Sequence, residues 1–301
     1  MKKSTINIMM AFLLLGGIIF TTASCKKARL NRETTTDEDN SLAESSFDDV
    51  DKSASEVAVK EEGVKSKTAP APEYSFGASC ATVTHKDANG VILYVNSVKY
   101  DTTKTDSAIK LAPFPRTIII DFGTGCTGND GRTRKGKIII SLSAKFWEVG
   151  TVITHTLDNY YVNDHHVEGV RKVTHSATNV WDVVVTGAKI TDPDGKTVSW
   201  ESTRTRTRTS GDATPFNIFD DVYSITGSAT GINREGRNFT VTITTALQLQ
   251  ACNWIAEITK GIIEIQPEGL KLRTVDFGDG TCDNEGTVTV GNKTKTFKLR
   301  K

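Results

Sequence analysis

Apolar and polar residues alternate along most of the chain after its first quarter. Phe239, Val241 and Ile243 would lie on one face of a strand, with Thr240 and Thr242 on the other. β-branched residues dominate these runs, and turn residues separate them at roughly ten-residue intervals. The pattern predicts an all-β, antiparallel protein of about fourteen strands with no convincing helix. We expect a meander that is sandwich-like or a curved open sheet with one solvated face.

Two stretches share one pattern. TIIIDFGTGC at 117–126 and RTVDFGDGTC at 273–282 each run into Asp-Phe-Gly and then a glycine-rich turn that holds a cysteine. We expect the aspartate to cap the turn and the phenylalanine to pack inward. The repeat predicts two similar strand–turn–strand modules within a β domain spanning 73–301. The modules lie near 80–143 and 252–299 and flank a meander at 144–251.

The first 24 residues have the form of a signal peptide, with a short basic start and a mostly apolar run. Thr22-Ala-Ser-Cys25 resembles the lipobox of bacterial lipoproteins. That resemblance implies cleavage before Cys25, acylation of its thiol and attachment of the chain to a membrane through lipid. Lys26 and Lys27 follow, which by the same resemblance implies the bacterial outer membrane, on its periplasmic or its outer surface. The alternative is an ordinary secretory signal.

Residues 33–62 carry eleven acidic and two basic side chains, a net charge of −9, among many Ser, Thr and Ala residues. Such a segment buries too little apolar surface to offset the entropy lost on ordering. We therefore expect 25–72 to be an acylated cysteine followed by a disordered acidic tether. A flexible chain of this length would hold the β domain on the order of 40 Å from the lipid. The alternative is a segment that recruits a cationic partner or metal ions.

Four cysteines remain besides Cys25: Cys80, Cys126, Cys252 and Cys282. An even number in an exported chain predicts disulfides, and four cysteines allow three pairings. Because one cysteine precedes each Asp-Phe-Gly turn and one lies within it, the repeat favours Cys80–Cys126 and Cys252–Cys282. The chain has no CxxC pair, so thiol redox catalysis and thiolate zinc sites are not expected.

The run STRTRTRT at 202–209 would place Arg204, Arg206 and Arg208 on one strand face. Three aligned guanidinium groups can bind phosphate, sulfate or uronate, so an anionic glycan or lipopolysaccharide is the candidate ligand. The alternative is a solvated strand face, paired with Asp220 and Asp221 or blunting a sheet edge. Aromatic residues do not interleave with these arginines, so nucleic acid is not an expected partner.

Acidic residues gather at the second Asp-Phe-Gly turn, where Asp276, Asp279 and Asp283 are candidate ligands. No cofactor is expected; carboxylates and turn carbonyls suit calcium, but the EF-hand spacing is absent. The alternative is turn capping. DFGDGT at 276–281 is similar to the turn of PKD-type immunoglobulin-like domains, which implies a shared local turn. Asp-Phe-Gly is also a protein-kinase motif, but the Gly-rich loop and the HRD motif of kinases are missing, so a kinase is not predicted.

The whole mature chain resembles a group of uncharacterised exported bacterial lipoproteins, a resemblance that implies no activity. It rests on the signal ending in Cys25 and on DFGTGCTGNDG at 121–131, DNYYVN at 158–163, DDVYSITGSATG at 220–231 and DFGDGTCDN at 276–284. HExxH and GxSxG are absent, and no catalytic residues are predicted. We expect a lipid-anchored envelope protein with a non-enzymatic binding or structural role. The alternative is a secreted hydrolase, or a glycan- or lipid-handling enzyme with a dispersed active site.

Overall fold

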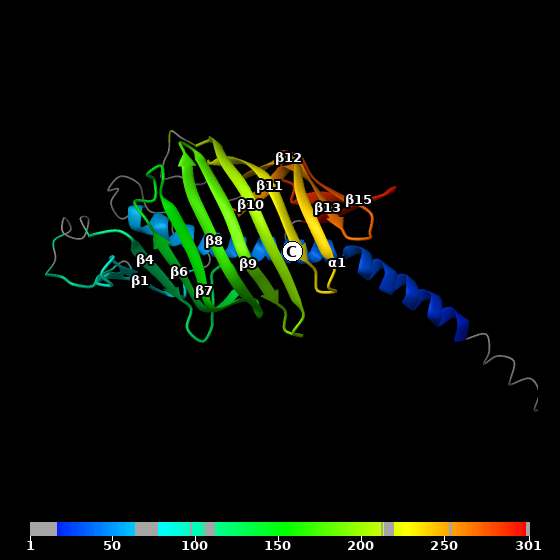
Figure 1. The fold of residues 1–301 in the computed structure, drawn as a ribbon, viewed down its shortest axis with the longest axis horizontal. Coiled ribbons are helices and arrows are strands. Elements are labelled where there is room, and N and C mark those ends of the chain that lie inside the picture. Colours follow the sequence, from blue (N-terminus) through cyan, green and yellow to red (C-terminus); the bar gives the residue numbers. More distant parts are fainter. Residues whose placement is uncertain are drawn as a thin grey trace, which may run out of the picture.

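The computed structural model contains one long helix and one large antiparallel sheet (Figure 1). It describes residues 17–63, 78–96, 98–103, 105, 112–211, 213, 220–252 and 255–298, with the side chains of the helix described over 34–57. The helix, α1, spans Gly17–Gly63. The strands are β1 (Thr82–Lys86), β2 (Ile92–Val95), β3 (Val98–Lys99), β4 (Arg116–Asp121), β5 (Cys126–Thr127), β6 (Thr133–Leu142), β7 (Val152–Val162), β8 (His165–Ala177), β9 (Val180–Thr191), β10 (Thr197–Ser210), β11 (Val222–Ile232), β12 (Asn238–Cys252), β13 (Ile255–Pro267), β14 (Arg273–Asp279), β15 (Glu285–Val290) and β16 (Lys293–Lys298).

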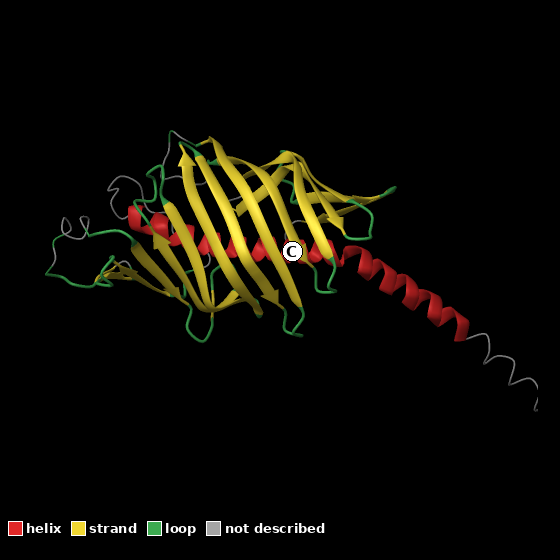
Figure 2. Cartoon of the chain, in the orientation of Figure 1, coloured by secondary structure: helices red, strands yellow, loops and turns green. Residues whose placement is uncertain are grey.

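All sixteen strands belong to a single sheet, in the order β16-β15-β14-β13-β12-β11-β10-β9-β8-β7-β6-β4-β1-β2-β3, with β5 paired to β6. Every pairing is antiparallel, so consecutive turns alternate between the two ends of the strands. The first and last strands of the order do not pair with each other, and the sheet is open. The predicted all-β antiparallel fold is therefore confirmed as a curled open sheet, shown in yellow around the helix in Figure 2.

The sheet buries one face and exposes the other. Val241 is fully buried on β12 while Thr240 and Thr242 on either side of it are exposed. The same alternation buries Ile138 on β6 and Val185 on β9. This confirms the predicted solvated face, because a single antiparallel layer needs cover on only one side.

The cover is α1, and here the prediction of a disordered tether at 25–72 is wrong for the described part. Residues 17–63 are helical, and the helix crosses the inner face of the sheet against β10, β9, β7 and β6 (Figure 1). Thr36, Phe47 and Val50 are at most 4 % exposed. The composition of this segment predicted disorder because a composition takes no account of how the apolar residues are spaced. The basic partners of the acidic side chains also lie far away in the sequence. Residues 64–72 lie outside the described part of the chain.

Both Asp-Phe-Gly turns form as expected. Asp121 Oδ1 accepts a hydrogen bond from the backbone N–H two residues later at 2.9 Å, and Asp276 Oδ1 does the same at 2.9 Å. The following phenylalanines are buried, Phe122 at 3 % and Phe277 at 8 % exposure. The short polar side chain thus closes each turn while the aromatic ring anchors it in the core.

The predicted disulfide pairing is confirmed. Cys80 bonds to Cys126 and Cys252 bonds to Cys282, with sequence separations of 46 and 30 residues. Each bridge closes one of the two modules. The strands of both modules, and of the meander between them, run on as one hydrogen-bonded sheet.

Candidate functional site

The helix presents a continuous buried stripe to the sheet. Its buried positions recur every three or four residues, as in Asn40, Ala43, Phe47, Val50, Ala54 and Val57. Phe47 stacks on Trp200 with ring centroids 6.0 Å apart. Trp200 Nε1 also donates a hydrogen bond to Asn40 Oδ1 at 3.1 Å. The spacing keeps one side of a helix toward the core, so α1 is part of the core itself.

Carboxylates flank this stripe and meet arginines of the sheet, an arrangement that we call the helix–sheet ion-pair interface. The pairs are Asp37–Arg273, Asp39–Arg234, Glu44–Arg204, Asp49–Arg132, Asp49–Arg134, Asp51–Arg171 and Asp51–Arg206. The arginines come from β6, β8, β10 and β14 and from the segments before β6 and between β11 and β12. The acidic segment is thus matched, along its length, to a basic inner face.

Asp49 is one of the two most enclosed of these carboxylates, together with Asp39. The side chain of Asp49 and that of Arg134 are each 1 % exposed. Arg134 donates through both Nε, at 2.8 Å, and Nη2, Arg132 donates at 2.9 Å, and the Tyr160 hydroxyl also donates to Asp49. Burial and the Asp49 charge raise the pKa of Tyr160 well above its usual value, which keeps the hydroxyl a donor. Burial opposes the charge of Arg134, but its bonds to Asp130 and Asp49 outweigh burial and raise its pKa. The cluster is a buried charge pair with its hydrogen bonds filled.

Asp51 holds a second cluster further along the helix. Arg171 Nη2 lies 2.9 Å from Asp51 Oδ1, and Arg206 Nη1 lies 3.2 Å from Oδ2. Burial alone would raise the pKa of Asp51, but Arg171, Arg206 and His155 overcome it and lower this pKa to about 2. His155 itself is buried, and burial together with the Arg171 charge lowers its pKa to about 4. Asp51 is therefore ionised and His155 neutral at neutral pH.

In two other pairs, those of Asp37 and Glu44, the arginine does not fully offset the burial of the carboxylate. Burial raises the pKa of Asp37 to about 6, against the opposing charge of Arg273. Burial likewise raises the pKa of Glu44, although Arg204 lies 2.7 Å away. These carboxylates attract their arginines but lose hydration, and the loss of hydration has the larger effect on their pKa.

The three arginines singled out in the sequence lie on the inner face, as the alternation on β10 predicts. Glu44 and Asp51 of the helix engage Arg204 and Arg206. Arg208 Nη2 donates to Asn179 Oδ1 at 2.8 Å, and Arg208 Nη1 lies 3.6 Å from Asp221 Oδ1. The anions that face this row are thus carboxylates of the chain itself, two of them on the helix. The pairing of Arg208 with Asp221 matches the alternative in which acidic side chains of the same chain pair with the arginines. Binding of an external anion here stays a prediction.

The candidate metal ligands at the second turn accept hydrogen bonds from backbone N–H groups. Asp276 accepts from the Gly278 N–H at 2.9 Å, and Asp279 accepts from the Thr281 N–H at 3.1 Å. Asp283 in turn accepts from the N–H two residues later at 2.9 Å. Within the described residues, no three His, Cys, Asp or Glu side chains are arranged to hold a metal ion. Calcium binding stays a prediction, and turn capping accounts for the geometry of these aspartates.

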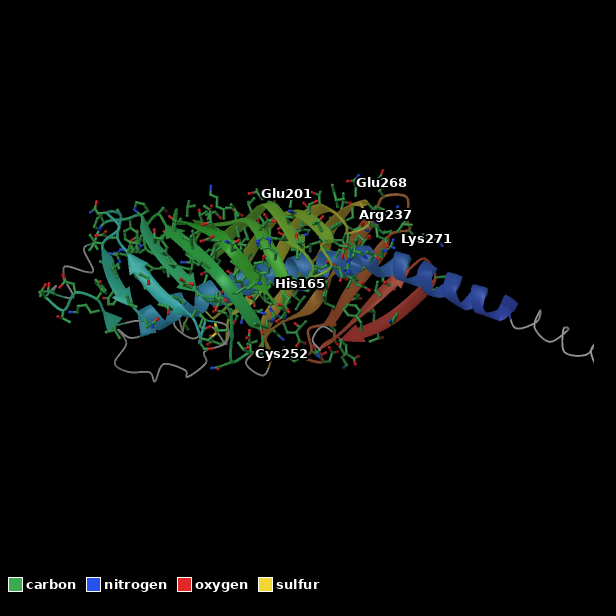
Figure 3. The ribbon with its side chains drawn as sticks, turned by 90° about the horizontal axis from the view of Figure 1, so that it is seen from below. His165, Glu201, Arg237, Cys252, Glu268 and Lys271 are labelled. Carbon is green, nitrogen blue, oxygen red and sulfur yellow. A yellow bond between two sulfur atoms is a disulfide. The ribbon has the colours of Figure 1, made fainter. Side chains whose placement is uncertain are left out.

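Two shallow depressions on the surface of the described residues could accept a small molecule. One lies at the β2–β3 edge, and another beside the β13–β14 turn, which Lys271 marks in Figure 3. Neither brings together a serine–histidine pair or converging carboxylates. Their lining residues are Val91, Ile92, Tyr100, Asp101 and Thr102 for the first, and Lys271, Leu272, Thr274, Thr289 and Gly291 for the second. In the described residues, no helix is long and apolar enough to cross a membrane.

Sequence reasoning missed the helix carboxylates and most of their partners, including Arg134, Arg171 and Arg273. One signal was present. Ala43, Phe47 and every third or fourth residue after them up to Val57 are small or apolar, which is a helical period inside an acidic segment. No local pattern indicates that Arg134, Arg171 and Arg273 pair with the acidic segment, because the carboxylates they meet lie far away in the sequence.

Comparison with known proteins gives no relative, because no protein-family model, curated protein or solved structure matches this chain.

Proposed function

We propose that this chain is a lipid-anchored protein of the bacterial outer membrane with a non-enzymatic binding or structural role. The observation that carries the proposal is the helix–sheet ion-pair interface. The inner face of a curled sheet is where such a fold would enclose a substrate, and here the chain's own helix fills it. Asp49 and Arg134 are buried within this interface and bond to each other.

The anchor is part of the same proposal. Thr34 lies nine positions after Cys25 on the helix, a rise of about 14 Å. An acyl group on Cys25 would therefore hold the sheet close to the membrane and in a fixed orientation. A flexible tether would instead let it range over several times that distance. Close, oriented attachment suits a protein that presents the exposed face of its sheet.

Labelling with a palmitate analogue tests the anchor directly. The full-length protein should take up the label and fractionate with membranes, and Cys25→Ser should lose both properties. Any Cys25→Ser protein that kept the label or the membrane fraction would contradict the anchor.

Binding experiments need the helix. A fragment that starts at residue 73 would expose Trp200 and leave Arg134, Arg171 and Arg206 without their carboxylates. The soluble form of choice is the mature chain from residue 25 with Cys25→Ser, which keeps α1 in place.

A further inference from the structure

The helix reverses its charge at the border of the sheet. Between Cys25 and Glu33 the sequence has four basic residues and no acidic one, whereas the net charge over residues 33–62 is −9. Thr36 already accepts a hydrogen bond from Asn233, which follows β11, and the helix before it projects beyond the sheet (Figures 1 and 3). We call residues 26–32 the basic segment, and its charged members are Lys26, Lys27, Arg29 and Arg32.

The two parts of the helix need partners of opposite charge. The acidic part has them in the sheet, beginning with Arg273, which pairs with Asp37. Such arginines carry the same charge as the basic segment and cannot neutralise it. On the helix itself, only Arg29 has a carboxylate three or four positions away, that of Glu33. The other three basic residues have no acidic neighbour at that spacing, so an anion from outside the chain is the partner that fits them.

The position of these charges is unfavourable for the helix itself. Cleavage before Cys25 would leave the basic segment in about the first two turns of the mature helix. The start of a helix carries partial positive charge, so acidic residues stabilise it there and basic residues do not. Helix stability therefore does not account for the basic segment. A bound anion would be attracted both by its side chains and by the helix dipole.

The spacing along the helix places these charges next to the proposed lipid. Arg32 lies seven positions after Cys25, a rise of about 10 Å, which is about one Debye length at 0.1 M salt. With 3.6 residues per turn, Arg29 and Arg32 share a helix face with Cys25. The same face continues to Ala43 and Phe47, which are buried against the sheet. Beyond the sheet, a membrane that holds Cys25 would lie close to this face.

Phosphate groups of membrane lipids are the anions expected this close to an acylated cysteine. Clusters of Lys and Arg beside a membrane anchor bind anionic headgroups, and each charge near the surface strengthens binding about fivefold. We propose that the basic segment of α1 binds the anionic phospholipid headgroups of the membrane that holds Cys25. The inference rests on the lipid anchor proposed above and names the surface chemistry that the protein meets there. Anchor and headgroup contacts together would fix the tilt of the helix, and with it the orientation of the sheet.

Vesicle flotation tests this with the mature Cys25→Ser chain, which carries no lipid of its own. The probes are vesicles of phosphatidylcholine alone and of phosphatidylcholine mixed with phosphatidylglycerol. The chain should partition onto the mixed vesicles and not onto the neutral ones. Added salt should reduce this partition steeply, because it screens exposed charges.

A charge-matched pair of variants assigns the binding to the basic segment. The test variant replaces three of its charges by glutamine, which preserves helix propensity: Lys26→Gln, Lys27→Gln and Arg32→Gln. The control removes three exposed lysines elsewhere on the helix and the sheet: Lys52→Gln, Lys172→Gln and Lys196→Gln. Circular dichroism verifies that both variants fold. The test variant should lower the partition coefficient about 100-fold, and the control should leave it within about twofold of wild type.

Three results would overturn the inference: no partition onto the mixed vesicles, equal partition onto neutral ones, or equal losses in the two variants. Displacement by inorganic phosphate at the concentration of the lipid phosphate would also overturn it, since the segment would then bind a free anion. Palmitate labelling reads out the anchor separately. A chain that takes up palmitate but does not partition keeps its anchor and refutes the headgroup contact, so the two failures are distinguishable.

Discussion

Replacing Asp49 with asparagine removes one buried charge from the helix–sheet ion-pair interface. Asparagine keeps the shape of the side chain but cannot neutralise Arg134, which is 1 % exposed. Arg134 would then rely on Asp130, and Arg132 and Tyr160 would lose a charged acceptor. Breaking a buried pair by removing one partner costs about 3–5 kcal/mol. That loss is a large share of the roughly 5–15 kcal/mol that stabilises a typical domain.

The neighbouring residue supplies a matched control. Asp48 carries the same charge on the same helix but is exposed, and its side chain forms no salt bridge within the described structure. Asp48→Asn should change the free energy of unfolding by no more than about 0.5 kcal/mol. Urea unfolding followed by tryptophan fluorescence and circular dichroism measures both variants. If Asp49→Asn and Asp48→Asn had equal, small effects, the buried ion pair could not be what holds the helix.

Three further predictions concern the core, the pH dependence and the disulfides. Phe47→Ala should lower the free energy of unfolding by about 3–5 kcal/mol and alter the fluorescence of Trp200, on which Phe47 stacks; a change below about 1 kcal/mol would contradict the packing. His155 has a folded-state pKa of about 4 against an unfolded value of 6.5, so the unfolded chain binds the proton more readily. The stability that neutral His155 contributes is present above pH 6.5 and is lost as the pH falls to about 4, a loss of about 3 kcal/mol. Urea titrations should therefore show that the free energy of unfolding falls less on acidification in His155→Gln than in wild type. Replacing Cys252 and Cys282 by serine opens a loop with a separation of 30 residues and should cost about 3–4 kcal/mol in a non-reducing urea titration, whereas no change would mean that the bridge does not constrain the unfolded chain.

The sheet was predictable because its signal is local. A two-residue period of the kind seen at Phe239, Val241 and Ile243 fixes which side of a strand faces the core, and the structure buries that side. The duplicated Asp-Phe-Gly turn was equally readable, since its aspartate, aromatic ring and cysteine all act within one module. The disulfide pairing followed from that repeat.

The helix was not predictable by the same reasoning, because its stabilising partners are distant. Asp49 meets Arg134 across 85 positions, and Glu44 meets Arg204 across 160. A net charge of −9 over residues 33–62 does indicate disorder for an isolated peptide. Only the fold supplies the opposite charges that remove this penalty. Arg204 and Arg206 of the row on β10 face Glu44 and Asp51 of the same chain, and binding of an external anion there stays a prediction.

The central claim is that the acidic segment is a helix packed against the sheet and not a flexible tether. Hydrogen–deuterium exchange of the mature chain tests this claim most directly. Backbone amides of residues 38–57 in α1 should be protected to a degree similar to those of β8, β9 and β10. Protection should fall in Asp49→Asn and persist in Asp48→Asn. Exchange of residues 38–57 at the rate of an unstructured peptide, beside a protected sheet, would contradict the account.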